Sequence, residues 1–495
     1  MARLRLAAGG LALAANAALH GQGVREDVRV ELVRVDVRVT DKKGNPVRDL
    51  APEDLRLFID GKPAKIEGLD PWSQVSLEPV REALAPLPGA PEPAPEAPPK
   101  PPPLFLAVLI DETSIATENR TPAMRRLDDA LRRLPQDVRL QLLRNEGALR
   151  IDVPWTTDAE AIRAALRAPR KAGPRLGPPG QSAAFSFPAE RRSATIDAMV
   201  VRRFQTEALG NYQEALRHFP SEPGRKALLL VTEGAPFLSP INVGEEAIAR
   251  NDPTSASGGG RASLGDDIQA RLAADAARDL VADSFTGRRL TWTTQMRAMT
   301  LEANRREIAL YPFRAVDMTA SIPPGNAATS PIAMSRTRAF HASGTQMEFV
   351  ADETGGKALL SRGGLGQEIE EVIARRREGY LLTFRDPSGD HEDHPIRLES
   401  VRPGLSLAYR RTYRVRPPQD RLLDAAEDAL IERRNDNRLG ARVKIEIVGR
   451  EGRQLVARVN VLYPAVAGTP IEPVPRVEIA GAVLSGEGYR SLPFH

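Results

Sequence analysis

The alternation of apolar and polar residues is clearest shortly after the start of the chain. Val28, Val30 and Leu32 alternate with polar residues, and after one change of phase the valines at 33–39 alternate again. A period of two predicts half-buried strands, and the phase change indicates a bulge or two separate strands. Another strand is expected at 55–59, followed by a hairpin turn at Asp60-Gly61. The pattern therefore predicts a small antiparallel β module.

From residue 104 the pattern changes to uninterrupted apolar runs separated by segments with helical periodicity. The run LFLAVLI is typical of a strand buried on both faces of a parallel sheet. Further strands are expected at VRLQLLRN, KALLLVT and IALYPFRAV, with a short one near GGKALL. Helices are expected at 122–134, 157–168, 192–219 and 265–306. This alternation predicts a doubly wound, Rossmann-like α/β domain with its ligand site beyond the carboxyl ends of the strands.

Changes in composition indicate where domains begin and end. Residues 83–103 are so rich in proline that they predict an extended linker. Alternating strands return after residue 380, and we expect them to pack with the first β module because the ends of an inserted domain lie close together. We expect a signal peptide at 1–23, an N-terminal β module at 24–82 and the linker at 83–103. An α/β domain at 104–380, strands at 381–415 that join the first module and a helix-plus-β extension at 416–495 should follow.

The start of the chain and its composition limit the compartment and the partners. Arg3 and Arg5 precede an apolar stretch and then small residues, which is the layout of a secretory signal peptide. No later segment is expected to cross a membrane, so we predict a secreted or periplasmic protein. The chain has no cysteine, which excludes disulfides and thiol catalysis. A net charge of +4 over 495 residues, without a basic stripe, argues against a nucleic-acid partner.

Several stretches together resemble a known family. They include VDVRVTDKKGNPVRDLAPEDLRLFIDGKPAKI, LFLAVLIDETS, PGRKALLLVTEGAPF, IALYPFRAV, ADETGGKALL and HPIRLESVRPGLSLAYRRTYRV, in this order over roughly residues 25 to 415. The set is similar to the bacterial secreted VWFA-related family, which contains a von Willebrand factor type A (VWA) domain. The resemblance implies a VWA fold and a role in protein–protein interaction or adhesion.

The resemblance also implies a metal-ion-dependent adhesion site, in which D-x-S-x-S and two further loops hold Mg²⁺ through oxygen ligands. Asp111 matches the aspartate of this motif, and Thr113 retains a hydroxyl at the second position. Ile115 occupies the third position and cannot ligate a cation, while Glu233 stands where an aspartate is expected. We therefore predict a degenerate metal site at Asp111, Thr113 and Glu233, with no cofactor needed and Mg²⁺ binding as the alternative.

Other functions remain open at this level. A hydrolase or phosphotransferase using Asp111 and Glu233 is one alternative, although a nucleophilic aspartate usually has a second aspartate two residues on, where this chain has Thr113. A structural envelope protein is another. We expect a non-enzymatic protein that binds another protein or envelope macromolecule through an acidic rim around Asp111 and Glu233. The DHEDH segment at 390–394 is expected to be a solvated hairpin loop.

Overall fold

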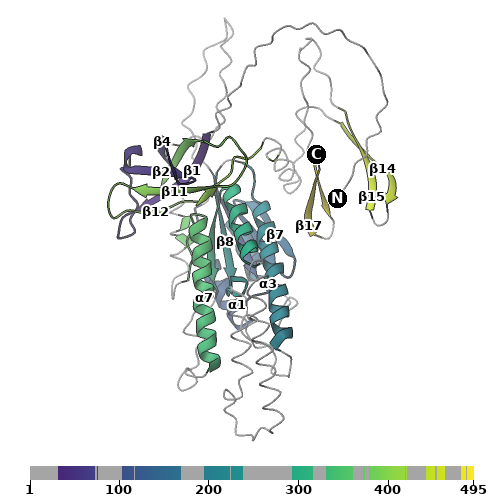
Figure 1. Cartoon of the computed structure of the whole chain (residues 1–495). Helices are drawn as coiled ribbons and strands as arrows, with labels where there is room; N and C mark the ends of the chain where they lie inside the picture. The colour runs from purple at the N-terminus through teal and green to yellow at the C-terminus, as the bar shows by residue number, and fades with distance from the viewer. Residues whose placement is uncertain are drawn as a thin grey trace, which may run out of the picture.

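The computed structural model describes residues 32–75, 103–168, 194–237, 292–315, 331–360, 369–420, 442–462 and 481–494, with short gaps inside some of these ranges. A β-sandwich and an α/β domain lie side by side in this part of the chain (Figure 1). The expected signal peptide, nearly all of the proline-rich linker and the first part of the helix expected at 265–306 lie outside the described residues. No helix in the described ranges is long and apolar enough to cross a membrane.

The β-sandwich combines strands from both sides of the α/β domain in the sequence. One sheet has the order β12-β1-β10-β4, formed by Ser406–Ala408, Leu32–Thr40, Tyr380–Arg385 and Ile66–Pro71. The other has the order β13-β11-β2-β3, formed by Thr412–Tyr413, His394–Ser400, Leu55–Ile59 and Lys62–Ala64. The alternating valines of β1 point into the core between the sheets, where they are buried. The period-two pattern thus places one face of β1 inside.

The α/β domain has a mixed sheet of five strands in the order β7-β6-β5-β8-β9. Its strands are Leu149–Thr156, Val138–Asn145, Leu104–Asp111, Arg225–Thr232 and Ile308–Arg314. All adjacent pairs are parallel except β6 and β7, which form a hairpin around Gly147 at φ 99°. Strand β7 was not expected from the sequence. It contains Pro154, which is tolerated because β7 is an edge strand.

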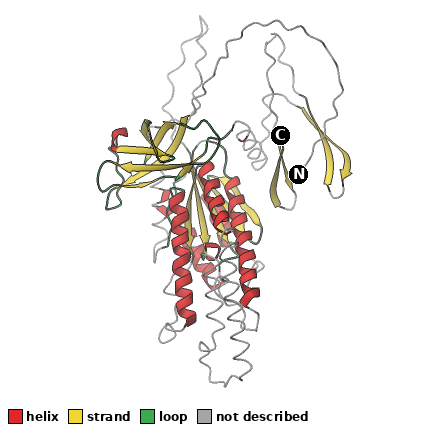
Figure 2. Cartoon of the chain, viewed as in Figure 1, coloured by secondary structure: helices red, strands yellow, loops and turns green. Residues whose placement is uncertain are grey.

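Helices cover both faces of this sheet, as the red ribbons on either side of the strands in Figure 2 show. The even-numbered side chains of β5 pack with α1 (Thr117–Leu131) and α2 (Ala159–Arg167). The odd-numbered ones pack with α3 (Ala194–Arg217), a helix over 292–305 and α7 (Pro331–Glu353). Every residue of β5 is therefore buried, which explains its continuous apolar run. The chain is a mixed α/β protein.

Three details differ from the expectations. Helix α1 begins at Thr117 and contains Pro122, so this proline does not mark the start of the helix. The short fifth strand is reduced to one parallel bridge between Phe313 and Leu359. Strands β10 and β11 do not form a hairpin with each other, because each belongs to a different sheet of the sandwich. Two further hairpins follow in the chain, from Arg442–Glu451 with Gln454–Leu462 and from Gly481–Ser485 with Gly488–Phe494.

Candidate functional site

The carboxyl ends of β5 and β8 bring the predicted site residues to one end of the sheet. The two strands are parallel neighbours, with Ile110 opposite Val231, so Asp111 and Glu233 follow adjacent strand ends. Ser114 Oγ and Thr232 Oγ1 are 2.8 Å apart and link the two loops. The strand-end rule therefore correctly places Asp111, Thr113 and Glu233 at the same edge.

The Asp111 carboxylate is enclosed by hydrogen-bond donors of the chain itself. Thr113 Oγ1 and Asn145 Nδ2 donate to Asp111 Oδ1 at 2.5 and 2.9 Å. Tyr212 OH donates to Asp111 Oδ2 at 2.5 Å. The Asp111 side chain is completely buried, and burial raises the pKa of its carboxyl group, although the hydrogen bonds from Thr113 and Tyr212 act in the opposite direction. Both carboxylate oxygens are thus occupied by internal contacts.

Tyr212 closes the corner from the face of the sheet that α3 covers. It lies on α3, is fully buried and stacks on Phe237 at 6.2 Å between ring centroids. Burial, followed by the charge of Asp111, raises the pKa of the Tyr212 phenol well above its ordinary value. The phenol therefore keeps its proton and stays a donor to Asp111 Oδ2 across the pH range in which proteins are folded.

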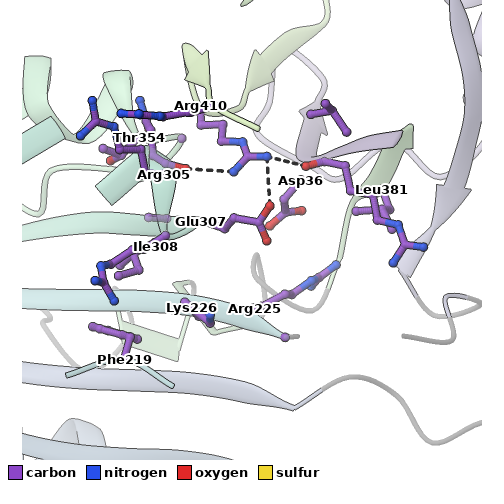
Figure 3. A pocket seen from close by; sticks show the side chains of 18 of the residues that line it. Asp36, Phe219, Arg225, Lys226, Arg305, Glu307, Ile308, Thr354, Leu381 and Arg410 are labelled. Carbon is purple, nitrogen blue, oxygen red and sulfur yellow. Dashed lines mark hydrogen bonds and ion pairs between the residues drawn. The ribbon is translucent and has the colours of Figure 1, made fainter. Parts of the chain in front are cut away.

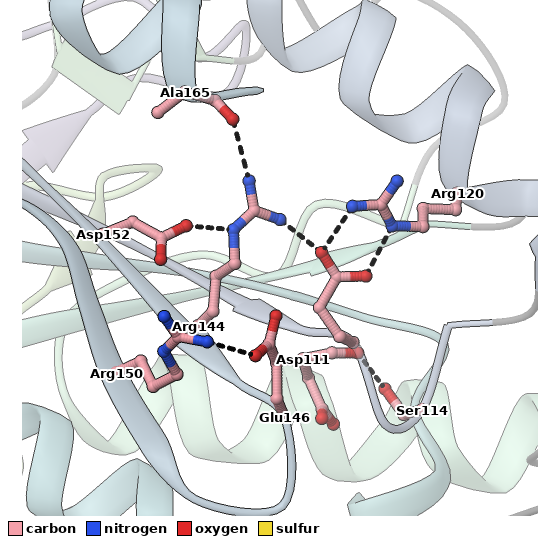
Figure 4. Close-up of polar contacts among 9 residues, drawn as sticks. Asp111, Ser114, Arg120, Arg144, Glu146, Arg150, Asp152 and Ala165 are labelled. Atoms are coloured by element: carbon pink, nitrogen blue, oxygen red, sulfur yellow. Dashed lines mark hydrogen bonds and ion pairs between the residues drawn. The ribbon is translucent and has the colours of Figure 1, made fainter. Parts of the chain in front are cut away.

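A buried arginine neutralises the next carboxylate along the chain. Arg144, at 0% exposure, contacts both Glu112 and Asp152, and its Nη2 donates to the Ala165 carbonyl at 3.3 Å (Figure 4). Arg120 also binds Glu112, with nitrogen–oxygen distances of 2.6 and 3.0 Å. Charged pairs with several hydrogen bonds tolerate burial far better than isolated charges do. Both carboxylate oxygens of Glu112 therefore bind arginines of the chain.

Glu233 and Ile115 complete the description of the predicted site. Glu233 is 2% exposed, and its Oε1 accepts from Asn119 Nδ2 at 2.9 Å. The Ile115 side chain packs in the apolar core with the even-numbered side of β5. No group of three or more histidine, aspartate or glutamate side chains in the described ranges is arranged to hold a metal. The donor set does not fit a six-coordinate cation, because the Asp111 oxygens already accept protein hydrogens and Ile115 supplies no oxygen.

The expected acidic rim is wrong. Asp111 and Glu233 are buried, and Glu112 is paired with Arg120 and Arg144, so these carboxylates do not present negative charge to a partner. Sequence reasoning missed Tyr212, Asn145 and Arg144. One signal was available: Arg144 and Asn145 end a strand that is expected to be buried, where polar side chains need internal partners.

The expectation of a solvated DHEDH loop holds for Asp390, His391 and Glu392, which are exposed, but it is wrong for His394. His394 begins β11, is 8% exposed and lies 2.8 Å from both Asp60 Oδ2 and Asp390 Oδ1. Burial lowers the pKa of His394, but the hydrogen bonds to Asp390 and Asp60 outweigh it and raise the pKa above the ordinary value. His391 contacts the Val415 carbonyl at 3.0 Å. The two histidines have separate partners and hold loops of the sandwich together.

Comparison with known proteins adds only distant structural neighbours. No family model and no curated protein matches the chain. Conserved hypothetical protein BatB from Bacteroides thetaiotaomicron is 11% identical, with 55% of this chain and 98% of that chain covered and a TM-score of 0.26. An aerotolerance-related membrane protein from Bacteroides fragilis is 9% identical, with 55% of this chain and 98% of that chain covered and a TM-score of 0.24. A mutant of the PilB minor pilin from Streptococcus sanguinis is 10% identical, with 72% of this chain and 80% of that chain covered and a TM-score of 0.30. Scores this low support no conclusion about function.

Proposed function

We propose that the chain is an exported, VWA-like interaction protein whose metal corner has been replaced by an internal hydrogen-bond cluster. The observation that carries this proposal is the enclosure of Asp111 by Thr113, Asn145 and Tyr212. In this arrangement the corner stabilises the end of the sheet and leaves partner binding to other surfaces. The colinear stretches that resemble the VWFA-related family, together with a mixed α/β sheet and an aspartate at the end of its central strand, support the VWA assignment.

The enzymatic alternative requires Asp111 and Glu233 to reach a substrate. A nucleophile or general base must lie within hydrogen-bond distance of the reacting atom. Asp111 is 0% exposed with both oxygens occupied, and Glu233 is 2% exposed and bound by Asn119. Opening this corner would break several buried hydrogen bonds, each of which leaves a donor unsatisfied at a cost of about 1–3 kcal/mol. The geometry therefore favours interaction over chemistry at this end of the sheet.

The proposal is tested by crosslinking the full chain in its native cell envelope and identifying the attached proteins by mass spectrometry. Parallel samples contain Mg²⁺ or EDTA, and the exposed α1 variant Asp129→Ala serves as a control for surface charge. We expect the same specific partner in both samples, because no bridging cation is required. Capture that disappears with EDTA would contradict the metal-independent corner, and the absence of any specific partner would favour the structural envelope protein.

A second assay addresses the hydrolase alternative. The full chain is incubated with para-nitrophenyl phosphate, and release of phosphate is compared between the natural chain and Asp111→Asn. We expect no release above that of the buffer from either protein. Turnover that is present in the natural chain and lost in the variant would assign a catalytic role to Asp111 and overturn the proposal.

A further inference from the structure

A cavity of about 560 Å³ lies at the opposite end of the sheet, between the β-sandwich and the α/β domain. Figure 3 shows side chains from both domains pointing toward it, including Asp36 and Leu381 from the sandwich and Lys226 and Ile308 from the amino ends of β8 and β9. Its size is within the range of roughly 300–1,000 Å³ that is usual for small-molecule sites, which often lie at domain junctions.

The lining of this cavity is strongly cationic. It contains eight arginines and one lysine but only two carboxylates, Asp36 and Glu307, which gives the lining a formal charge of +7. The whole chain carries +4, so the residues outside the cavity sum to −3. The positive charge of this protein is therefore concentrated at one place. A cavity wall of one sign with few counter-charges attracts anions, because the surrounding low-dielectric protein focuses the field.

Ion pairs hold several of these arginines. Glu307 pairs with Arg410 at 3.0 Å. Two carboxylates outside the lining also bind lining arginines: Asp393 binds Arg305 at 2.5 Å, and Glu302 binds Arg306 at 2.6 Å. The nine cations and two carboxylates of the lining, together with these two outside carboxylates, carry a formal charge of +5. Ion pairing of this kind holds arginines in place.

Several cationic side chains are fixed in position before any ligand arrives. Arg410 donates to the carbonyls of Asn304 and Arg34 at 2.9 and 2.6 Å, which joins the two domains across the cavity. The Arg225 guanidinium lies 4.1 Å from the centre of the Trp72 ring. Rigid cations lose little conformational freedom on binding, so a fixed wall increases affinity for an anion.

We propose that this cavity binds a small ligand that carries two or more phosphate groups. Guanidinium groups match phosphate oxygens through paired hydrogen bonds, and eight of the nine cations are arginines. A phosphate group carries about −1.5 to −2 charges at neutral pH, more than the single charge of a carboxylate, which suits a compact cavity whose lining is rich in arginine. The proposal is independent of the function assigned to the Asp111 corner, because the two sites lie at opposite ends of the strands.

The test is isothermal titration calorimetry on the full chain with sodium tripolyphosphate, a nucleoside triphosphate and a short poly-glutamate peptide at low salt. We expect both phosphate compounds to bind with one-to-one stoichiometry, and affinity to fall as salt rises. Tighter binding of the nucleoside triphosphate would identify the ligand class as phosphorylated organic molecules. Equal or tighter binding of tripolyphosphate would identify it as inorganic polyphosphate. Poly-glutamate that binds more tightly than both would overturn the phosphate assignment.

Variants with equal charge distinguish the cavity from general attraction. Arg34→Gln/Arg414→Gln removes two lining cations, whereas Arg125→Gln/Arg126→Gln removes two exposed arginines of α1. We expect at least a tenfold loss of tripolyphosphate affinity in the first variant and less than a twofold loss in the second. Circular dichroism confirms that both are folded. No binding to the natural chain, or equal losses in the two variants, would overturn the proposal.

Discussion

The two ends of the central sheet differ in their charged residues. At the carboxyl end, Asp111 is buried and the side chain of Glu112 is 10% exposed, and each is satisfied by neutral donors or arginines of the chain. At the amino end, Arg225 and Lys226 begin β8 beside a cavity where cations exceed carboxylates. Ligands of α/β proteins usually bind at the carboxyl end. Here that end is closed, whereas the cavity at the domain junction has a cation-rich lining, and we place ligand binding there.

Two arginines illustrate the difference. Arg144 at the carboxyl end is fully buried and contacts two carboxylates and a carbonyl, so its charge is used in stabilising the fold. Arg225 at the amino end lies over the face of Trp72, a contact that orients its guanidinium group at the cavity wall. Ion pairs between buried residues therefore close one end, and an aromatic ring positions a cation at the other.

The largest expected effect is the loss of the Asp111 carboxylate. Asp111→Ala leaves the Thr113, Asn145 and Tyr212 donors without their acceptor, so we expect the free energy of unfolding to fall by about 3 kcal/mol in urea denaturation. The exposed control Asp129→Ala should change it by no more than about 0.5 kcal/mol. Equal stability of the two variants would show that the carboxyl end is not the closed cluster described above.

At the amino end, the expected effect depends on pH. Burial, together with the charges of Arg306 and Arg217, lowers the pKa of His218 to about 4. The folded chain therefore keeps His218 neutral while the unfolded chain protonates it near pH 6.5, so stability falls as pH decreases from 6.5 to 4. The loss is on the order of 3 kcal/mol at most. In urea denaturation, His218→Gln should remove this dependence of the free energy of unfolding on pH. An unchanged dependence would show that a lowered pKa of His218 is not its cause.

A smaller effect compares two buried tyrosines at the two ends. Tyr212→Phe removes a hydrogen bond to Asp111 and should cost about 2 kcal/mol of stability. Tyr311 lines the cavity, and its hydroxyl has no hydrogen-bond partner in the described part of the chain, so Tyr311→Phe should cost almost nothing. Thermal unfolding of both variants measures the difference. If Tyr311→Phe proves the more damaging change, the contrast between the two ends fails.

The last variant changes Glu307, where two opposing effects on stability partly cancel. This residue has φ 60°, a backbone conformation that glycine adopts more readily, and its half-exposed carboxylate pairs with Arg410. Glu307→Gly relieves the backbone and removes an ion pair whose carboxylate is half exposed, so we expect a stability change within about 1 kcal/mol. The same variant should bind tripolyphosphate severalfold more tightly, because the lining loses a carboxylate. Weaker binding in calorimetry would contradict an anion site.

Local patterns predicted the framework of the α/β domain. Apolar runs identified β5, β8 and β9, a mixed pattern identified β6, and the strand-end rule placed Asp111 beside Glu233. Strand β7 escaped prediction because Pro154 and weak alternation conceal an edge strand. The contacts that close the corner could not be predicted, because Tyr212 lies 101 positions from Asp111 and only tertiary packing brings them together.

The cationic cavity could not be predicted from the sequence either, because tertiary packing brings its residues together. Its basic residues come from β1, the start of β8, the end of the helix over 292–305 and the segment at 410–416. None of these segments forms a basic stripe by itself, so a net charge of +4 gave no indication of the concentration. Charge distribution in a folded chain is a property of the domain arrangement, which periodicity does not encode.

Thermal unfolding of the full chain in three solutions tests the contrast between the ends most directly. The solutions contain Mg²⁺, EDTA or tripolyphosphate, and a ligand present at a hundred times its dissociation constant adds about 2.7 kcal/mol of stability. We predict the same Tm in Mg²⁺ and EDTA and a higher Tm in tripolyphosphate. A Tm that rises with Mg²⁺, falls back in EDTA and does not respond to tripolyphosphate would show that the carboxyl end binds a cation and that the amino end binds no phosphate.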